Sequence, residues 1–385
     1  APPVPRAPRA TARSIENRFY RLALDPQRGG IASLYDKELQ RELVDADAAH
    51  LLGQLIVRDS ATAEHETLRV TGSALVESGP LYSTLRVRGS ASCCPCVAVE
   101  VTLYHTTKRI DVCARILRDS TPMRELYLAF PFQVPAPRFR FEAPGSVIRP
   151  IRDQWPGSNT DAYGVQHWVH VGGEGWGITW TPLDTPMAEL GGLWPGYVSG
   201  AHHGVRGPDY GHPFLTADEL EGAHARAHIY ALISYNNFRT NFVNVHPDEY
   251  VVRYTFSSHP GDWRGARAWQ AGWNAANPPL AVWMNGPQEG DLPAQASFCQ
   301  VDAPNVMTLT LKPAEDGDGL ILRLIETAGQ ETTATVTLPT LSIQHAWETN
   351  LVEENECPLP CTPHAVQITL APYTMRTLRI QAIPA

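Results

Sequence analysis

The sequence is poor in charged side chains and contains no long apolar run. Charged residues make up 18% of its 385 residues, and the formal net charge is −9. A chain that binds nucleic acid needs an excess of basic residues, which is missing here. No apolar stretch approaches the roughly 20 residues that span a bilayer, and the start shows no signal-peptide pattern. We therefore expect a cytoplasmic protein that binds neither nucleic acid nor membrane.

The sequence also lacks a regular cysteine framework. Cys93, Cys94 and Cys96 form one cluster, and a total of seven cysteines leaves at least one thiol free. The cluster could bind a metal, but no second pair of Cys or His at zinc spacing accompanies it. Reduced thiols at the tip of a hairpin are the preferred interpretation. We accordingly predict no metal site and no cofactor in this chain.

Glycine and proline are frequent, with 29 and 33 residues, which favours turns over long helices. Apolar and polar residues alternate in Leu85–Gly89, Val97–Leu103, Ile110–Ile116 and Tyr250–Phe256. Because successive side chains of a strand point to opposite faces, each run predicts a strand with one buried face. Closely spaced strands with few helical patterns between them predict an all-β fold of packed antiparallel sheets.

The same patterns divide the chain into three segments. Residues 1–13 carry prolines and arginines without apolar periodicity and are predicted to be a linker or tail. Residues 14–275 are predicted to form a large β domain, and residues 276–385 a small C-terminal β-sandwich domain. A single helix is expected at Trp263–Trp273, where tryptophans recur at helical spacing and pack against the sheets.

Two local patterns mark the ends of the large domain. The strand-like runs Ile15–Leu24 and Ile31–Asp36 flank a Gly29-Gly30 turn and predict a hairpin. Near the other end, Asp262 is a suitable N-cap for the expected helix. The helix is expected to stop before two consecutive prolines, Pro278 and Pro279.

The most informative loop is Asp153–Asn159, which precedes a predicted strand. Asp153, Gln154 and Trp155 combine a carboxylate, an amide and an aromatic ring. This combination of side chains suits carbohydrate binding, because sugar hydroxyls need hydrogen-bond partners and the C–H face of a sugar packs on flat apolar surfaces. We predict these three residues as carbohydrate contacts. The alternative is an ordinary turn, since Pro-Gly dipeptides mark turns in many proteins.

Two further segments carry candidate contacts. Asn236, Asn237, Arg239 and Asn241 follow an apolar strand, and their side chains suit sugar hydroxyls, although such residues also cap strand bends. The segment from Gly191 to His212 has no regular pattern, which is common for functional loops, and it supplies Trp194 and His202. Its histidines with Asp209 offer metal ligation as the weaker alternative.

Several motifs occur in a recognisable order along the chain. They are Glu16–Arg21, Asp153–Ser158, Val165–Val169, Tyr235–Phe242, Leu322–Glu326, Ala346–Leu351 and Leu370–Leu378. Together they resemble the region of family 38 glycoside hydrolases, the α-mannosidases, that follows the catalytic barrel. The resemblance implies a galactose-mutarotase-like supersandwich followed by a small β-sandwich.

The resemblance also implies what this sequence does not contain. In the family an N-terminal α/β barrel supplies the catalytic Asp and a divalent metal, usually zinc. No parallel βα pattern and no His-x-Asp pair near the start is found here. Nor does the sequence suggest two acids at the separation of roughly 5 Å that retaining hydrolysis needs. We therefore assign no catalytic residue and no metal ligand, and we expect zinc only in the missing domain.

The resulting hypothesis is that this chain is the β-domain portion of an α-mannosidase-like glycoside hydrolase. It would pack against the catalytic barrel of the same enzyme, help to form the cleft for an α-mannoside-type glycan, and be inactive alone. Homo-oligomerisation is left open. The alternative is a stand-alone carbohydrate-binding or structural β module without catalysis.

Overall fold

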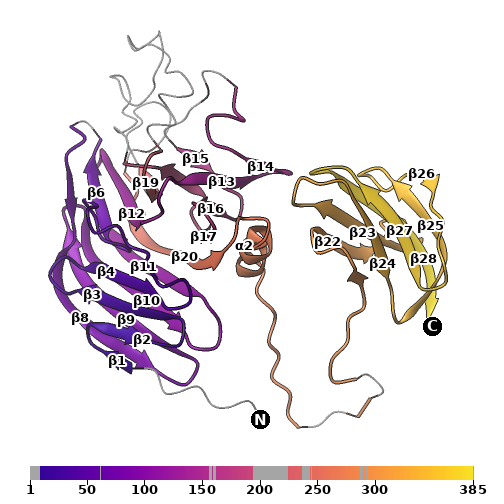
Figure 1. Ribbon diagram of the computed structural model, residues 1–385, viewed down its shortest axis with the longest axis horizontal. Helices are drawn as coiled ribbons and strands as arrows, with labels where there is room; N and C mark the ends of the chain where they lie inside the picture. The colour runs from indigo at the N-terminus through magenta and orange to yellow at the C-terminus, as the bar shows by residue number, and fades with distance from the viewer. Residues whose placement is uncertain are drawn as a thin grey trace. The chain divides into compact units, whose positions relative to one another are not determined.

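The computed structural model describes residues 9–60, 62–155, 158, 162–193, 224–235, 243, 245–286, 289–290 and 293–384. The chain divides into two compact units (Figure 1). The large unit runs to Glu142 and from Ile148 to Asn277, and the small unit comprises Ala143–Val147 and Pro278 onward. The boundary predicted between residues 275 and 276 lies close to this division. The helical segments among the described residues fall short of the length and hydropathy that a transmembrane helix requires.

The large unit opens with a five-stranded sheet in simple sequence order. Its strands are β1 (Arg9–Thr11), β2 (Ser14–Glu16), β3 (Tyr20–Asp25), β4 (Gly30–Asp36) and β5 (Arg41–Glu42). The β3–β4 hairpin confirms the predicted turn, and Gly29 has a φ of 75°, a left-handed value that favours glycine. Buried Tyr20 ties this sheet to the rest of the unit, because its hydroxyl lies 2.9 Å from Ser258 Oγ.

Two larger sheets form the body of the unit. The nine-stranded sheet has the order β14 (Ser146–Ile148), β13 (Arg138–Ala143), β16 (Val169–Gly172), β17 (Trp176–Pro182), β20 (Asp248–Pro260), β11 (Ile110–Arg118), β10 (Cys94–Tyr104), β9 (Tyr82–Ala91) and β8 (Arg69–Ser78). The six-stranded sheet has the order β15 (Tyr163–Gly164), β18 (Met187–Leu190), β19 (Ala227–Tyr235), β12 (Arg124–Phe132), β6 (Leu55–Asp59) and β7 (His65–Thr67).

Aromatic side chains fill the space between these two sheets. Phe130 of β12 lies edge-on to Trp180 of β17 and to Tyr254 and Phe256 of β20, at centroid distances of 5.4, 5.2 and 6.2 Å. All four residues are buried. Such contacts add to the stabilisation from burying large apolar surfaces. The sheets therefore form a sandwich around one core.

The small unit is a second sandwich. One sheet contains β21 (Gln300–Val301), β24 (Thr332–Thr337) and β27 (Ala365–Leu370). The other has the order β22 (Val306–Pro313), β23 (Leu320–Glu326), β28 (Met375–Pro384), β25 (Leu341–Thr349) and β26 (Asn355–Pro358). Buried residues from both sheets share one apolar cluster that includes Leu322, Val336, Ile368 and Leu378. The all-β prediction, a supersandwich followed by a small β-sandwich, is confirmed.

Three local predictions need correction. The run Ile15–Leu24 is two strands, because Asn17 Oδ1 accepts hydrogen bonds from the backbone N of Phe19 and Tyr20 at 2.9 and 2.7 Å and turns the chain. Part of the predicted tail is strand β1, which pairs with β2. The helix, α2, spans Ala268–Ala276 rather than Trp263–Trp273.

The late start of α2 has a local cause. Asp262 Oδ1 accepts a hydrogen bond from Gly265 N at 2.8 Å, which holds a separate turn, and Arg267 then adopts a left-handed φ of 52°. The predicted packing role of the tryptophans is confirmed, since Trp263 stacks on buried Trp168 and Trp269 meets Trp263 edge-on.

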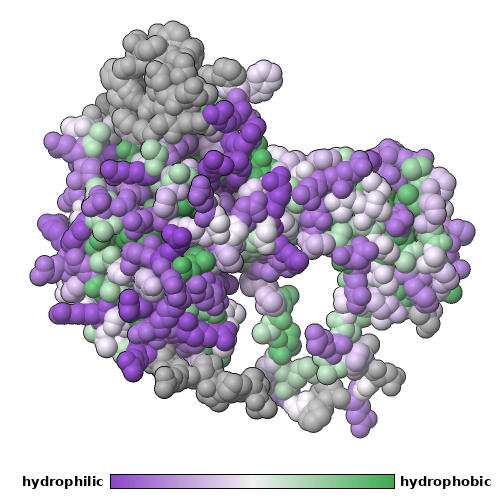
Figure 2. All heavy atoms as spheres, in the orientation of Figure 1, coloured by the Kyte–Doolittle hydropathy of each residue, from purple (hydrophilic) through white to green (hydrophobic). Residues whose placement is uncertain are grey.

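The segment after α2 exposes apolar side chains. Leu280, Val282 and Trp283 are 95%, 83% and 89% exposed, and Met284 follows at 57%. Figure 2 shows apolar side chains gathered along this connector. Contiguous exposed apolar residues are typical of a contact surface.

Candidate functional site

The described part of the predicted carbohydrate loop begins just after β14. Arg149 and Asp153 form a bidentate ion pair, with Arg149 Nη2 2.6 Å and Nε 2.9 Å from Asp153 Oδ1. The Asp153 carboxylate also accepts the Arg149 backbone N–H at 2.7 Å. The side-chain hydrogen bond from Arg149 is the main cause that lowers the pKa of Asp153. Asp153 thus stays ionised and fixes the loop.

The next two residues of the loop have different surroundings. Gln154 Oε1 accepts a hydrogen bond from Ile151 N at 2.7 Å, and Ile151 has a left-handed φ of 72°. Trp155 is 87% exposed, so its indole contributes little to the core. An exposed ring at the end of a hydrogen-bonded loop is a suitable platform for the C–H face of a sugar. Asp153, Gln154 and Trp155 stay predicted contacts.

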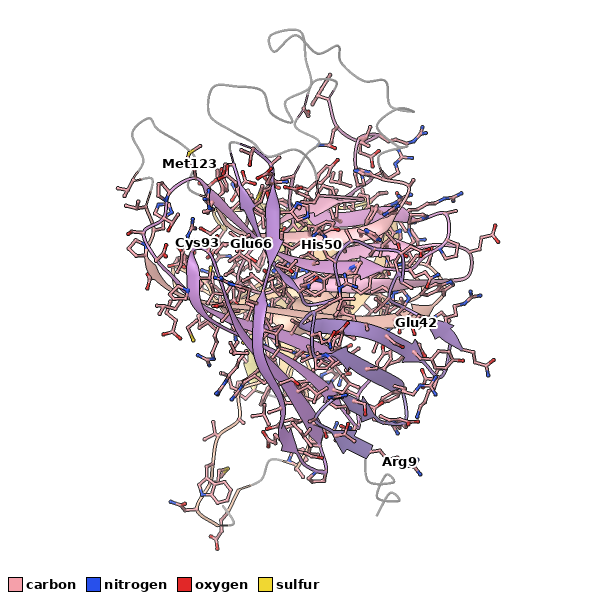
Figure 3. The ribbon with its side chains drawn as sticks, turned by 90° about the vertical axis from the view of Figure 1, so that its left-hand side faces the viewer. Arg9, Glu42, His50, Glu66, Cys93 and Met123 are labelled. Atoms are coloured by element: carbon pink, nitrogen blue, oxygen red, sulfur yellow. The ribbon has the colours of Figure 1, made fainter. Side chains whose placement is uncertain are left out.

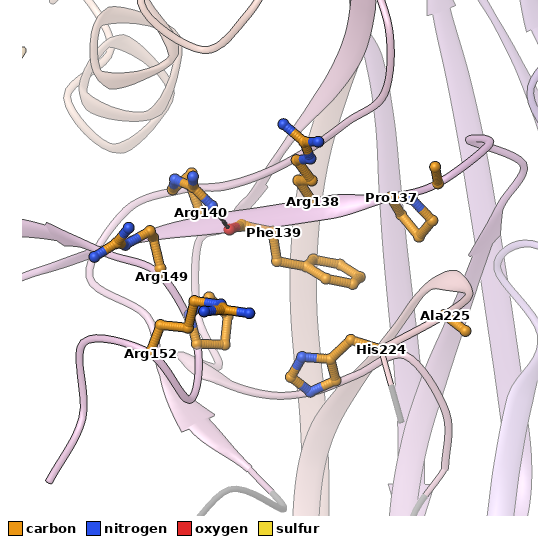
Figure 4. A pocket seen from close by; sticks show the side chains of 10 residues that line it. Pro137, Arg138, Phe139, Arg140, Arg149, Arg152, His224 and Ala225 are labelled. Carbon is orange, nitrogen blue, oxygen red and sulfur yellow. Dashed lines mark hydrogen bonds between the residues drawn. The ribbon is translucent and has the colours of Figure 1, made fainter. Parts of the chain in front are cut away.

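A pocket of about 640 Å³ lies beside this loop (Figure 4). Its lining includes Arg138, Phe139, Arg140, Arg149, Arg152 and His224. Phe139 and His224 are buried and meet edge-on, with ring centroids 5.7 Å apart. This volume is typical of sites for small ligands. Sequence reasoning missed the pocket because its lining comes from β13, the Arg149–Arg152 turn and the residues before β19, which are far apart in the chain.

The remaining predicted contacts lie outside the described residues. They are Trp194, Asn236, Asn237, Arg239, Asn241 and His202. Pro156, Gly157 and Asn159 of the first loop lie outside them as well. Whether the two predicted segments share one side of the domain therefore stays a prediction.

A buried ionic network occupies the six-stranded sheet. Arg58 of β6 donates from Nε to Glu125 Oε2 at 2.6 Å, and its Nη2 lies 3.5 Å from Glu189 Oε1 of β18. Tyr127 donates its hydroxyl to Glu125 at 3.0 Å. Burial, followed by the charges of Glu189 and Glu125, raises the pKa of Tyr127 well above its usual range. The side chains of Arg58 and Glu125 are 3% and 2% exposed.

This network can be assigned a structural role from its geometry. The guanidinium of Arg58 faces Glu125 and Glu189, and all three side chains are buried against solvent. A buried charge requires an opposite charge close by. No local sequence pattern could have found it, because Glu125 and Glu189 are 67 and 131 residues from Arg58.

The predicted reduced state of the cysteine cluster matches the thiols found here. All seven cysteines are free, and Cys93 and Cys94 are buried with their Sγ atoms 3.6 Å apart. Figure 3 shows Cys93 near Glu66, whose Oε1 accepts the backbone N–H of Ser92 at 2.7 Å. Among the described residues, no group of three or more His, Cys, Asp or Glu side chains could hold a metal. The described residues therefore offer no set of ligands for the zinc that the family resemblance implies.

Two family models match this chain. The model of the glycosyl hydrolases family 38 C-terminal domain matches residues 15–181. The model of the family 38 C-terminal beta sandwich domain matches residues 305–378. Together they cover well over half of the sequence. No curated protein matches the chain.

Solved structures give a similar result at the level of the fold. An alpha-mannosidase from Enterococcus faecalis V583 matches with a TM-score of 0.68 and 13% identity, over 96% of this chain and 42% of its own. A family 38 protein from Enterococcus faecalis matches with a TM-score of 0.69 and 14% identity, over 96% of this chain and 44% of its own.

The chain thus spans less than half the length of these two proteins. The family models, in the order in which they occur along the sequence, agree with a large β sandwich followed by a small one. The chain belongs to glycosyl hydrolases family 38 and comprises the C-terminal domain and the C-terminal beta sandwich domain of that family.

Proposed function

We propose that this chain is the β-domain portion of an α-mannosidase-like glycoside hydrolase. It packs against a catalytic barrel of the same enzyme and helps to form the cleft for an α-mannoside-type glycan. Zinc and the catalytic carboxylates belong to the barrel, so the chain alone turns over no substrate. Family membership supports the enzyme class, and the TM-score of 0.68 to the alpha-mannosidase supports the fold.

One observation carries the cleft assignment. Trp155 is 87% exposed, yet the residues before it are fixed by the Arg149–Asp153 ion pair and the Gln154 hydrogen bond. A fixed loop that presents an aromatic ring loses little conformational entropy when a sugar binds. The exposed apolar connector, Leu280–Met284, supports a contact with another part of the enzyme.

The first prediction tests the cleft in the complete enzyme. Trp155→Ala should raise KM for an aryl α-mannoside roughly fivefold, the equivalent of about 1 kcal/mol for one lost contact. The melting temperature should not change, because an exposed indole adds little to the core. Steady-state kinetics and thermal unfolding measure the two effects.

A matched control is Leu81→Ala, which removes a 60% exposed apolar side chain from another turn of the large unit. It should leave both KM and the melting temperature unchanged. An unchanged KM for Trp155→Ala would contradict the cleft assignment. Turnover of the glycoside by the isolated chain would contradict the proposal that the barrel supplies the catalytic residues. Sugar binding by a native protein that contains these two units and no barrel would instead favour the stand-alone binding module.

A further inference from the structure

A second pocket, which we call the α2 pocket, lies within the large unit beside α2. Its volume is about 360 Å³, and its lining comes from β17, β20, α2 and residues 107–109. Figure 1 shows α2 next to β17 and β20. The described residues that line it include none that line the pocket beside the Asp153 loop. The two pockets are therefore separate places on the chain.

Hydroxyl side chains form the floor of the α2 pocket. Thr179 and Thr181 of β17 lie opposite Ser257 and Thr255 of β20, and all four line the pocket. Residues two apart on a strand, and residues paired across two strands, point to the same face of a sheet. Trp180, between the two threonines of β17, points to the other face and into the core. The floor is thus the face of the nine-stranded sheet that is turned away from the core.

One of these hydroxyls is buried and has no protein partner. Thr179 Oγ1 lies 3.0 Å from His259 Nε2, and Thr255 Oγ1 donates to Ile110 O at 3.1 Å. Within the described part of the chain, the side chain of Thr181 has no hydrogen-bond partner, although Thr181 is only 2% exposed. Buried polar groups in proteins nearly always have a partner. A ligand in the α2 pocket would satisfy this hydroxyl.

Small side chains on α2 leave the space above the floor. Ala271, Asn274 and Ala275 recur at helical spacing and line the pocket, so they form one side of the helix. The helix approaches the sheet closely elsewhere, because a Cβ at Gly272 would lie 2.9 Å from Trp168. The two alanines offer apolar surface to the pocket, and the amide of Asn274 adds donors and an acceptor.

The charges at the edge of the pocket favour a neutral ligand. Lys108 Nζ lies 2.8 Å from Asp36 Oδ2 and 2.9 Å from Glu38 Oε2. Arg109 Nε lies 2.7 Å from Asp111 Oδ1. The two cations that line the pocket thus face three carboxylates, a net charge of −1, which repels an anion.

The remaining groups suit a sugar ring. Hydroxyl and amide side chains both donate and accept hydrogen bonds, as the hydroxyls of a sugar do. The volume of 360 Å³ lies near the lower end of the range for small-molecule sites, which fits a single ring rather than a long oligosaccharide.

We propose that the α2 pocket is a second carbohydrate site and binds one neutral hexose ring. The hydroxyls of the ring bond to Thr181, Ser257 and Asn274, and its C–H face packs on Ala271 and Ala275. The inference goes beyond the proposed function and does not rest on it, because the cleft at Trp155 uses other residues.

The test is saturation-transfer difference NMR on the whole chain. The probes are mannose, glucose and galactose, followed by the uronate that corresponds to the hexose that binds best. At least one hexose should bind saturably. Its uronate should bind more weakly, because oxidation at C6 adds a charge of the sign that the pocket already carries.

Thr181→Val should weaken the binding of the hexose about fivefold, the usual effect of one lost hydrogen bond. Ala275→Phe should abolish it, because a ring at this position occupies the pocket, and this variant keeps the test valid if Thr181→Val folds poorly. The matched control is Thr84→Val on β9. Thr84 is also buried, and its Oγ1 lies 2.8 Å from Thr102 Oγ1, but it does not line the pocket. It should keep the full affinity, and thermal unfolding checks the fold of each variant.

Trp155→Ala separates the two sites, and the hexose should still bind saturably to this variant. Loss of binding in Trp155→Ala would place the hexose at the proposed cleft and overturn the inference. It would be overturned as well if no hexose binds saturably below about 100 mM, if the uronate binds as tightly as its hexose, or if Thr84→Val weakens binding as much as Thr181→Val. Failure of the proposed function has a different signature, because KM in the complete enzyme would then not respond to Trp155→Ala.

Discussion

Arg58→Met is expected to lower the free energy of unfolding by about 3–5 kcal/mol, the usual effect of breaking a buried ion pair. The variant keeps most of the side-chain volume but removes the cation between Glu125 and Glu189. Both carboxylates then remain in a site where Glu125 is 2% and Glu189 6% exposed. Desolvated charge without that partner is costly because the interior screens it poorly. Urea denaturation of the isolated chain measures the loss.

The control for this prediction is Arg253→Met. Arg253 forms a bidentate pair with Asp184, at 2.8 and 3.0 Å, but its side chain is 58% exposed. An exposed pair contributes at most about 1 kcal/mol. Adding Glu125→Gln to Arg58→Met should recover part of the stability, because it removes one of the two buried charges. A loss for Arg58→Met no larger than that for Arg253→Met would show that the network is not a stabilising element.

Gly177→Ala is expected to cost about 1–3 kcal/mol through overpacking. Gly177 of β17 pairs with Gly172 of β16, and a Cβ at position 177 would lie 2.4 Å from His170 Nε2. A Cβ at position 172 would lie 2.3 Å from Cε1 of the same ring. The imidazole of His170 therefore fills the space that two absent methyl groups leave. It is 4% exposed and stacks on His259, with centroids 5.3 Å apart, so it has little room to move.

A double variant separates this clash from a general effect of replacing glycine. Burial, followed by the charge of His259, lowers the pKa of His170 to about 3, so the ring is neutral at physiological pH. His170→Ala should make Gly177→Ala much less costly than it is in the native chain, as expected for residues in contact. Gly72→Ala on β8 is the matched control, because its Cβ would meet nothing within 4 Å. Equal losses at positions 72 and 177 would contradict the explanation.

The strands of this fold could be predicted because their information is local. On β9, Val87 and Gly89 are buried while Arg88 between them is exposed, which is the alternation that the sequence shows. The start of α2 could not be predicted in the same way. Tryptophan spacing continues upstream to Trp263, but the Asp262–Gly265 hydrogen bond closes a turn there before the helix begins.

The candidate site was predictable only in part. The Asp153 loop carries its chemistry in consecutive residues, and Trp155 is exposed as a contact residue must be. The pocket beside it depends on β13 and on His224, which only the fold brings near Arg149. Alternation on β13 could have placed Arg138 and Arg140 on one side of a strand, but nothing local indicates that a cavity lies beside them.

The thiols described above also provide a way to measure how the two units are arranged in solution. Cys96 belongs to the large unit and Cys357 to the small one, and both are exposed. Cys93 and Cys94 are buried, and Cys113, Cys299 and Cys361 are partly so. Maleimide dyes should therefore label one site in each unit first, without any engineered cysteine. Energy transfer between those dyes would report the separation of the units, and its change on adding the rest of the enzyme would report docking.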